Sequence, residues 1–515
     1  LGVTINASGV AISGVCTAGI VSATTLYGDG SNLAGVGESI APWNYNPDVN
    51  DQEVLTNTGI GITFNKKILA GSGTATVKIV NAGVAGTVHQ SWGISSATFN
   101  VTEFTLGALV SPLTVNETYQ VDIPSGFIVD SNETSYVGTA WTFSIQDPVN
   151  KLWVWGDNEI GRLGVNSTVD YSSPVQVPGT TWKSGWQQSN ANVTYNTGAV
   201  KTDGTLWMWG SNEKGQLGQN QRGAGGPAFH GYSSPTQIPG TTWSLVSSSA
   251  YSSAAIKTDG TLWAWGGNTI GQLGLNNQVQ YSSPVQIPGT TWRSVNIGLY
   301  NITATKTDNT LWGWGDNTGN LGQNNNIKYS SPVQVPGTTW KQSIAVSDSN
   351  TLAIKTDGTL WTWGKNDSGA LGLNNNIKYS SPVQVPGTTW AAFSGGNEWI
   401  LATKTDGTLW GWGAGGDGNL AQNNEVKYSS PVQIPGTWGT DELHIRAGRA
   451  NAYAIKADGT LWSWGYNGYG SLGQNAPESS RRSSPVQVGS LTDWHEVGGF
   501  GMNSAYAIQK DVTPN

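Results

Sequence analysis

Cysteine is nearly absent from this chain of 515 residues, in which Cys16 is the only one. A single thiol excludes a disulfide bond within the chain and a metal site built from several thiolates. No run of about 18 consecutive apolar residues occurs, so we expect no insertion into a membrane.

Charge is also scarce, at 11% of residues, and the formal net charge is −8. Lysine and arginine occur singly and form no basic stripe that could neutralise a phosphate backbone, so we expect no nucleic-acid partner. The four histidines are far apart in sequence, and no nucleophile motif accompanies them. We therefore predict a protein that is not an enzyme and that needs no cofactor or metal, although a site assembled from distant residues stays open. The histidines are His89, His230, His444 and His495.

Glycine, in contrast, is abundant, with 70 residues, and serine, threonine and asparagine are plentiful. This composition is typical of many short strands joined by tight turns, and it argues against long helices. We predict an all-β protein.

One pentapeptide pattern, Leu-Trp-x-Trp-Gly, occurs seven times at intervals of 49 to 56 residues. Such a period is the signature of a repeat architecture. With seven further tryptophans at a second repeated position, these copies contain 21 of the 26 tryptophans in the chain. The copies begin at Leu152, Leu206, Leu262, Leu311, Leu360, Leu409 and Leu461.

Each repeat is predicted to form four strands. In the third repeat these are residues 243–246, 254–258, 261–266 and 283–287. Asp259-Gly260 between the second and third strands is predicted to be a two-residue hairpin turn, because glycine accepts a positive φ at low cost. Other repeats carry Asp-Gly at the same place, with Asp308-Asn309 as the one variant.

The third strand of each repeat indicates how the repeats pack. Trp263 and Trp265 share one face of the strand, whereas Leu262 and Ala264 share the other. A strand that is bulky on one face and small on the other can stack between two neighbouring sheets, as in a β-propeller, which protects the edges of its four-stranded sheets.

The two ends of the repeat region predict ring closure. The region starts directly at a third strand, Leu152, and ends with a first and a second strand, at 494–497 and 505–509, that lack a third. Together the ends supply one complete blade. We therefore predict a seven-bladed β-propeller over residues 148–515.

This repeat resembles that of the regulator of chromosome condensation family, whose units read Trp-Gly-x-Asn-x-x-Gly-x-Leu-Gly after an apolar strand. Residues 209–218 match this signature, and near-copies follow in the other repeats over residues 151–511. The resemblance implies the fold and not the activity, since members include a nucleotide exchange factor and a protein inhibitor of β-lactamases. This sequence lacks the histidine that many members carry between strands one and two, so we do not expect a chromatin or GTPase role.

Residues 38–147 contain alternating segments that predict a β-sandwich of about 100 residues. The clearest segments are 61–64, 75–79, 119–123 and 140–144. Together with Ile123-Pro124-Ser125-Gly126, they resemble bacterial Ig-like modules of surface and phage proteins.

Residues 1–37 are too few to bury a core of their own. Their alternating stretch 2–10 and the segment 28–33 are similar to segments of tail-fibre and virion proteins of cyanobacterial phages. The resemblance implies an extended fibre shaft in which copies of the strand pair with one another in a homo-oligomer, a trimer being the simplest case. A disordered linker is the alternative.

Almost all differences between repeats fall in the loops after strands one and three, which emerge at one end of the propeller. Relative to the 49-residue repeat, loops near 187–197 and 219–231 carry five and seven extra residues, and a smaller extension lies at 440–451. Aromatic rings beside Asn and Ser on such loops could stack on sugars, so we predict a ligand-binding surface here, with tolerated surface variation as the alternative. The candidate residues are Trp186, Tyr195, Arg222, Phe229, His230, Tyr251, Tyr300 and Trp399.

Both termini of the propeller should lie at its other, uniform end, so that the variable end points away from the attachment. This arrangement favours a virion fibre or appendage that recognises a host-surface glycan or protein and contacts other virion proteins through residues 1–37. The alternatives are a secreted or surface bacterial adhesin that binds a protein, outside the cell or on its surface, and a purely structural virion decoration.

Overall fold

The structure is a computed structural model that falls into two compact units, Leu1–Gln146 and Asp147–Asn515, and each unit is considered by itself. The residues it describes are 2–6, 9–13, 42–46, 61–64, 68–81, 84–100, 103–106, 118–130, 133, 135, 136, 138–144, 149–185, 194–223, 231–346, 350–476, 480–499 and 503–511.

The first described strands, β1 (Gly2–Asn6) and β2 (Gly9–Ser13), form an antiparallel hairpin in which Gly2 lies opposite Ser13. The expectation of one continuous strand over 2–10 is therefore wrong, because the chain reverses after Asn6 and pairs with itself. The segment 28–33 lies outside the described residues.

The rest of the first unit is built from two four-stranded sheets and one strand pair, with sheet orders β12-β10-β6-β7, β3-β4-β9-β8 and β11-β5. All four predicted segments are confirmed as strands. The elements are β3 (Pro42–Asn46), β4 (Gly61–Phe64), β5 (Ile68–Ala70), β6 (Thr74–Asn81), β7 (Val84–Gly93), the 3₁₀ turn η1 (Ile94–Ser96), β8 (Thr98–Asn100), β9 (Glu103–Thr105), β10 (Thr118–Ile123), β11 (Ile128–Asp130) and β12 (Thr139–Ser144).

One shared core joins these sheets. Phe104 of β9 packs edge-on against Phe127, with ring centroids 5.5 Å apart, and both rings are fully buried with Val77 of β6 and Val121 of β10. Alternate residues of β6, β9 and β10 are buried in this core, as a sandwich requires.

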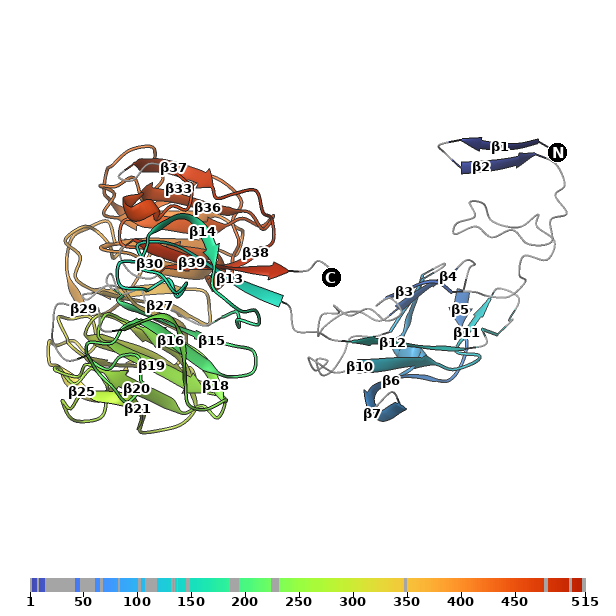
Figure 1. The fold of residues 1–515 in the computed structure, drawn as a ribbon, viewed down its shortest axis with the longest axis horizontal. Helices are drawn as coiled ribbons and strands as arrows, with labels where there is room; N and C mark the ends of the chain where they lie inside the picture. The colour runs from blue at the N-terminus through green and yellow to red at the C-terminus, as the bar shows by residue number, and fades with distance from the viewer. Residues whose placement is uncertain are drawn as a thin grey trace. The chain divides into compact units, whose positions relative to one another are not determined.

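The second unit forms seven sheets from its described residues, which we number as blades 1–7 (Figure 1). Six sheets have four strands. Blade 2 has three. At the place where the other blades have their first strand, Trp182 forms an isolated bridge to Lys201. The strands are, in blade 1, β13 (Val149–Gly156), β14 (Tyr171–Gln176), β38 (Trp494–Gly499) and β39 (Ser504–Asp511); in blade 2, β15 (Asn196–Val200), β16 (Leu206–Ser211) and β17 (Gly231–Ile238); in blade 3, β18 (Trp243–Ser248), β19 (Ser252–Lys257), β20 (Leu262–Gly266) and β21 (Tyr281–Ile287); in blade 4, β22 (Trp292–Ile297), β23 (Asn301–Lys306), β24 (Leu311–Gly315) and β25 (Tyr329–Val335).

The remaining elements are, in blade 5, β26 (Trp340–Val346), β27 (Asn350–Lys355), β28 (Leu360–Gly364) and β29 (Tyr379–Gln384); in blade 6, β30 (Trp390–Gly395), β31 (Trp399–Lys404), β32 (Leu409–Gly413) and β33 (Tyr428–Ile434); and in blade 7, β34 (Ile445–Ala447), β35 (Asn451–Ile455), β36 (Leu461–Tyr466) and β37 (Arg481–Gln487), with 3₁₀ turns η2 (Glu442–His444) and η3 (Gly468–Gly470). The first strands of successive blades contact one another from β18 through β38, so they are the inner strands that surround the propeller axis.

Ring closure occurs as predicted. β39, from the end of the chain, pairs antiparallel with β13 over eight residues, from Val149 opposite Asp511 to Gly156 opposite Ser504. The chain therefore enters and leaves the propeller at the same end.

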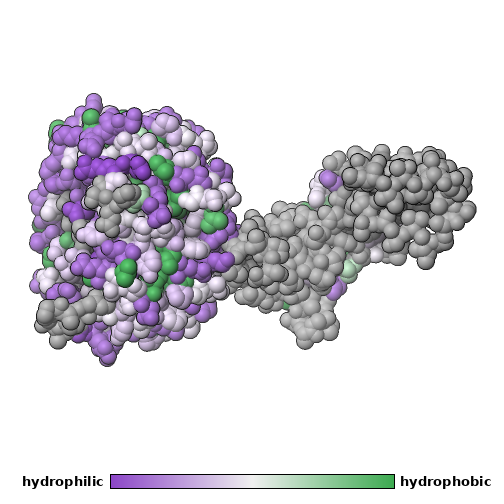
Figure 2. Space-filling model, turned by 45° about the horizontal axis from the view of Figure 1, so that its top comes forward, coloured by the Kyte–Doolittle hydropathy of each residue, from purple (hydrophilic) through white to green (hydrophobic). Residues whose placement is uncertain are grey.

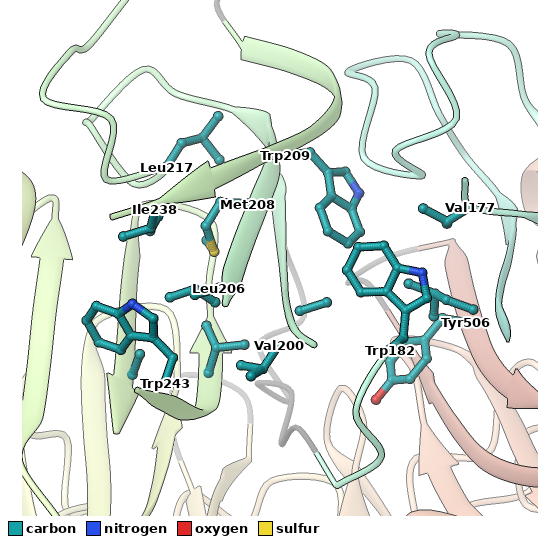
Figure 3. Close-up of a cluster of buried hydrophobic side chains, with 14 of the residues drawn as sticks. Val177, Trp182, Val200, Leu206, Met208, Trp209, Leu217, Ile238, Trp243 and Tyr506 are labelled. Atoms are coloured by element: carbon teal, nitrogen blue, oxygen red, sulfur yellow. The ribbon is translucent and has the colours of Figure 1, made fainter. Parts of the chain in front are cut away.

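The tryptophans hold neighbouring blades together. The second tryptophan of each Leu-Trp-x-Trp pair is fully buried, and its indole N–H donates to a backbone carbonyl of the preceding blade, as Trp265 does to Gln216 at 2.8 Å. Figure 3 shows this packing between blades 1, 2 and 3, with Trp209 and Trp243 on either side of Leu206 and Met208. The other six bonds join Trp155 to Ser471, Trp209 to Arg162, Trp314 to Gln272, Trp363 to Asn320, Trp412 to Ala370 and Trp464 to Asn419.

The first tryptophan of each pair is only partly buried, whereas the second tryptophan and the tryptophan of the first strand are buried. In blade 3 its ring, Trp263, contacts the ammonium of Lys257 at 4.4 Å from the ring centroid, and Lys257 also lies 4.8 Å from the centroid of the inner-strand Trp243. Lysines occupy the same position in blades 2 to 7, and Gln509 replaces them in blade 1.

The hairpin between the second and third strands has three residues rather than the predicted two. In blade 3, Gly260 N–H donates to the carbonyl of Lys257, and Lys257 N–H donates to that of Thr261. Only Gly260 has a positive φ, +77°, and the carboxylate of Asp259 accepts from the backbone and hydroxyl of Thr261. These bonds hold the pKa of Asp259 below its usual value, so the carboxylate is charged in the turn.

Candidate functional site

The two ends of the propeller differ in kind. At the turn end, which holds the three-residue hairpins, the same Asp-Thr-Trp hydrogen bonds recur in blades 2 to 7. At the loop end, which holds the loops after the first and third strands, several backbone hydrogen bonds of the described residues also recur from blade to blade, but the side chains differ. A rigid frame with variable side chains is the usual setting for recognition.

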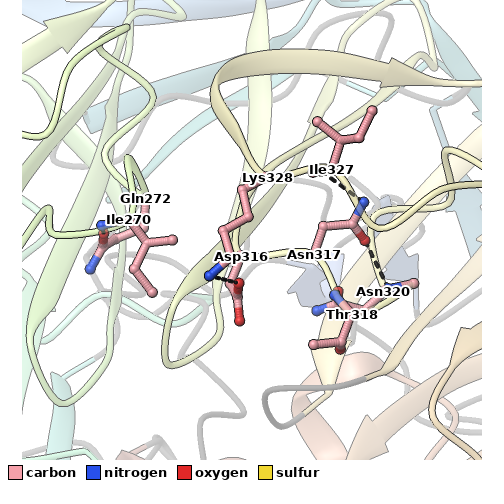
Figure 4. A network of polar contacts seen from close by, with 9 residues as sticks. Ile270, Gln272, Asp316, Asn317, Thr318, Asn320, Ile327 and Lys328 are labelled. Atoms are coloured by element: carbon pink, nitrogen blue, oxygen red, sulfur yellow. Dashed lines mark hydrogen bonds and ion pairs between the residues drawn. The ribbon is translucent and has the colours of Figure 1, made fainter.

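A buried asparagine fixes the loop end in most blades. In blade 4 the side-chain oxygen of Asn317 accepts from Gly319 N–H at 2.9 Å, and its amide donates to the carbonyls of Asn325 and Ile327 at 3.1 and 2.9 Å (Figure 4). Lys328 pairs with Asp316 at 2.8 Å beside it. These bonds hold the long loop after the third strand in one conformation.

A second frame fixes the residue immediately before the second strand in blades 1, 2, 3, 4, 6 and 7. In blade 3 this residue is Tyr251, whose carbonyl accepts from Gly267 N–H at 2.7 Å, and Tyr195 and Tyr300 make the equivalent bonds in blades 2 and 4. The same backbone bond is thus kept in these blades while the side chain at this position varies.

Three tyrosines at this position are brought together across blades 2, 3 and 4. The ring of Tyr251 stacks on that of Tyr300, with centroids 6.1 Å apart and an interplanar angle of 22°, and Tyr195 meets Tyr251 edge-on at 6.2 Å. All three are partly exposed. We call these residues the tyrosine arc.

Charge at one end of the arc comes from Arg162, which sequence reasoning missed. Its guanidinium lies 5.9 Å from the ring centroid of Tyr195 and pairs with Asp157 at 3.4 Å. Arg162 occupies the second position of the Gly-x-Leu-Gly motif, where every other repeat has a neutral residue. This difference in charge could have marked Arg162 from the sequence alone. Burial and the neighbouring tyrosines raise the pKa of Tyr251, so its hydroxyl stays protonated and can donate a hydrogen bond.

The position of the arc holds no aromatic residue in blades 6, 7 and 1. In blade 6 it holds Glu398, which has a φ of +62° and accepts from Lys365 at 2.8 Å and from Ser368 at 2.6 Å. These bonds lower its pKa. Blades 7 and 1 carry Ala450 and Asn503 there. The tyrosines at this position are thus confined to blades 2, 3 and 4.

Other predicted site residues lie elsewhere. Trp399 is only 1% exposed and its indole N–H donates to the carbonyl of Arg449 at 3.1 Å, so its inclusion in the binding surface is corrected: it is a core residue between blades 6 and 7. Arg222 is exposed and bonds the side chain of Gln280 in blade 3 at 3.2 Å. Trp186, Phe229 and His230 lie outside the described residues.

The third predicted extension is not at the loop end. The additional residues of blade 7 form the segment Gly439–His444, which precedes the inner strand β34 and therefore lies at the turn end. The length of the repeat shows that blade 7 has additional residues. It does not show whether they precede or follow the short strand β34 (Ile445–Ala447), and this decides the end of the propeller at which they lie.

Figure 2 shows hydrophobic residues in small patches on the visible face of the propeller, and the loop end also exposes Val169, Val279, Ile327, Ile377 and Val426. No three or more His, Cys, Asp or Glu side chains among the described residues are arranged to hold a metal ion. In that same part of the chain, no helix has the length and apolar character needed to cross a membrane.

These features define a closed seven-bladed propeller built from Trp-Gly repeats. The chain belongs to the RCC1-like domain family, whose family model matches residues 151–506, and residues 43–145 match the bacterial Ig-like domain family. Propellers of the RCC1-like family mediate protein binding.

Among curated proteins, the chain is similar to human Protein RCC2, with 36% identity over 83 residues, and to the mouse X-linked retinitis pigmentosa GTPase regulator, with 32% identity over 130 residues. These matches cover 16% and 25% of this chain but only 15% and 12% of the relatives. The match to RCC2 and that to the regulator each concern a small part of those proteins.

Among solved structures, Prp20p from Saccharomyces cerevisiae, described with its binding to Gsp1p and histones, has a TM-score of 0.60 at 16% identity. Human WBSCR16 has a TM-score of 0.59 at 20% identity. Both similarities cover 71% of this chain, and 92% and 100% of the respective structures. At this identity they show the fold alone. Neither the described residues nor these comparisons point to catalysis.

Proposed function

We propose that this protein is a non-enzymatic recognition protein whose loop end binds a host-surface partner through the tyrosine arc, and that the propeller is displayed on a virion fibre or appendage. The observation that carries the proposal is the mutual contact of Tyr195, Tyr251 and Tyr300 across three blades, on a backbone frame that other blades use for different side chains. Tyrosines held in this way offer rigid contact area and hydroxyl groups at low entropic cost.

A surface glycan is the first candidate for the ligand. Partly exposed tyrosine rings can stack on sugar rings, and the hydroxyl of Tyr251, kept protonated by its raised pKa, can donate to a sugar oxygen.

A protein partner is the second candidate. One argument for it is that the chain belongs to the RCC1-like family. A second is that Tyr251 stacks on Tyr300, which covers part of each ring face and leaves the ring edges and hydroxyl groups for contact with a partner. Tyrosine is enriched in protein interfaces for this combination of properties.

The test is Tyr251→Ala in the full chain, with Glu398→Ala as the matched control, because Glu398 occupies the same position in blade 6. We expect Tyr251→Ala to weaken binding to a glycan array, or to intact candidate host cells, at least tenfold, an interface effect of about 1.4 kcal/mol or more. Equal binding by the two variants would contradict the proposal.

Three further measurements separate the parts of the proposal. Cell binding that is lost after glycosidase treatment and kept after protease treatment supports the glycan, and the reverse supports the protein partner. Labelling of intact particles with an antibody against the propeller tests the virion location. Light scattering of the full chain and of a chain without residues 1–37 tests the homo-oligomer.

A further inference from the structure

The turn end contains a cavity of about 800 Å³ that the tyrosine arc does not reach. It is lined where the inner strands of blades 3, 4 and 5 begin, by Leu245, Arg293 and Lys341, and on the far side by the blade 7 segment Thr440–Glu442. A volume of this size accommodates several residues of a peptide rather than a single ion.

Blade 4 combines a cation at this cavity with a variant hairpin turn. Arg293 follows the inner-strand tryptophan, where blades 3 and 6 carry Ser244 and Ala391 and blades 2 and 5 carry lysine, and Asn309 replaces the glycine that the other hairpin turns carry. Nη1 of Arg293 donates to the side-chain oxygen of Asn309 at 2.8 Å. The variant turn therefore positions the guanidinium.

Two backbone bonds complete the placement of Arg293. Its Nη2 donates to the carbonyl of Lys341 at 2.6 Å and to that of Trp340 at 3.2 Å, across the boundary between blades 4 and 5. These three bonds use three of the five guanidinium N–H groups. Arg293 is thus fixed at the cavity wall, still exposed, beside the exposed ammonium-bearing side chain of Lys341.

The blade 7 segment indicates which charge the cavity accepts. Its 3₁₀ turn η2 contacts the inner strands β30 and β38 on either side, and Asp441 caps it by accepting from Leu443 N–H. This anchoring places Glu442 on the wall of the cavity that Arg293 also lines. Burial lowers the pKa of Arg293, and the charge of Glu442 opposes that shift. The carboxylate of Glu442 therefore interacts electrostatically with the guanidinium of Arg293, to which a ligand carboxylate would also bind.

We propose that this cavity is a second binding site, distinct from the tyrosine arc, and that it takes an acidic peptide segment of a partner protein, with a ligand carboxylate bound by Arg293 and Lys341. Glu442 competes with that carboxylate and limits the affinity. An arginine held by neighbouring acceptors is suited to this role because little further ordering is needed when the ligand binds.

The test uses the full chain and a fluorescein-labelled hexaglutamate peptide, with hexaglutamine as the uncharged probe, followed by fluorescence anisotropy at low and high salt. We expect hexaglutamate to bind, hexaglutamine to bind at least tenfold more weakly, and salt to weaken the hexaglutamate complex. Arg293→Gln is expected to weaken hexaglutamate binding at least tenfold, and Glu442→Gln to strengthen it about threefold.

Asn309→Gly is the sharpest variant, because it restores the residue that the other turns use and so keeps the hairpin while releasing Arg293. We expect it to weaken hexaglutamate binding two- to fivefold. Arg222→Gln, at the loop end, and Tyr251→Ala are the controls and should leave this binding unchanged.

Absence of hexaglutamate binding, or binding that Arg293→Gln leaves unchanged in a protein with native near-ultraviolet circular dichroism, overturns the proposal. Binding that Arg222→Gln reduces as much as Arg293→Gln also overturns it, because the charge effect would then be general. None of these outcomes bears on the tyrosine arc.

Discussion

Blade 1 and blade 3 are built from the same four strands, but blade 3 is continuous in sequence, whereas blade 1 combines β13 and β14 with β39 and β38 from the other end of the chain. Both keep the bond between a buried indole and the preceding blade, at 2.8 Å in each case. Two of the differences between them bear on closure. Lys257 and Leu245 of blade 3 are replaced by Gln509 and Glu496 in blade 1.

The replacements in blade 1 add hydrogen bonds at the closing seam. Glu496 is 1% exposed and accepts from the backbone of Gly185 at 2.8 Å and the hydroxyl of Ser184 at 3.0 Å in blade 2, and from Tyr506 at 2.9 Å in its own blade. Gln509 links Trp153 to Asp493. Blade 1, whose strands come from both ends of the chain, is therefore joined by polar bonds at positions where blade 3 has Leu245 and Lys257.

The largest effect is expected from deleting residues 494–515, which removes β38 and β39 and leaves blade 1 as a strand pair. The loss exposes Trp155 and Tyr453 and opens the ring, so we expect the cooperative unfolding transition of the propeller to be lost, since it rests on a net stability of about 5–15 kcal/mol. Thermal unfolding followed by tryptophan fluorescence measures this. Deletion of residues 1–146 is the control and should leave the propeller transition in place; a truncated ring that melts within a few degrees of the full chain would contradict closure.

The next effect concerns Glu496, whose pKa burial raises to about 7, against the hydrogen bonds from Gly185, Tyr506 and Ser184, which lower it. The unfolded pKa is near 4.5, so the folded protein binds more protons between pH 4.5 and 7, and its stability falls as the pH rises through this window, by at most about 3 kcal/mol. We expect Glu496→Gln to remove this slope in urea unfolding curves.

Two comparisons keep that result specific. Glu398→Gln should retain the slope, because the pKa of Glu398 is lowered and its contribution is lost only as the pH falls below its unfolded value. His444 and His495, whose pKa values burial lowers, titrate in both proteins, so the difference between the curves isolates Glu496. An unchanged slope in Glu496→Gln would show that the carboxylate is already ionised throughout.

A third effect compares one inter-blade bond at the seam with one inside the ring. Trp314→Phe removes the indole donor to the carbonyl of Gln272, whereas after Trp155→Phe the carbonyl of Ser471 still accepts from the hydroxyl of Tyr453 at 2.6 Å. We expect destabilisation of about 2 kcal/mol for Trp314→Phe and about 1 kcal/mol for Trp155→Phe in chemical unfolding. The reverse order would mean that the seam, not the interior of the ring, is the weaker contact.

The smallest effect is expected from exchanging Lys257 of blade 3 and Gln509 of blade 1, which occupy equivalent positions on the second strand. Lys257→Gln removes an ammonium that lies 4.4 Å from the ring centroid of Trp263, and we expect a loss of about 0.5–1 kcal/mol. Gln509→Lys, the reciprocal change in blade 1, breaks the bonds to Trp153 and Asp493 and should also destabilise. Stabilisation by Gln509→Lys in thermal unfolding would show that the closing blade needs no special bonds.

Much of the fold was predictable because the repeat is local. The number of blades and the pairing of the two chain ends follow from alternation and from the order in which strand types appear, and the structure confirms them. The strand limits in blade 3 were predicted to within two residues. The Asp-Gly hairpin was predicted one residue too short, because sequence marks the glycine of positive φ but not the register of the bonds around it. The hairpin of β1 and β2 was missed for the same reason, since a short alternating stretch does not show where it reverses.

The candidate site was predictable only in part. Sequence placed Tyr195, Tyr251 and Tyr300 at equivalent repeat positions, and equivalence within a ring is enough to expect neighbouring placement. It could not distinguish Trp399 from them, because Trp399 is one residue further along the chain, and a shift of one residue in a strand turns the side chain to the opposite face.

The amino-acid sequence by itself determined the propeller, its seven blades and its closure, because these depend on patterns that recur within about 50 residues. Tertiary structure alone decided which side chains remain exposed, that Arg162 joins the tyrosine arc, and that Arg293, Asn309 and Glu442 act on one another at the turn end. Those arrangements join residues of different blades, and their geometry exists only once the ring has closed.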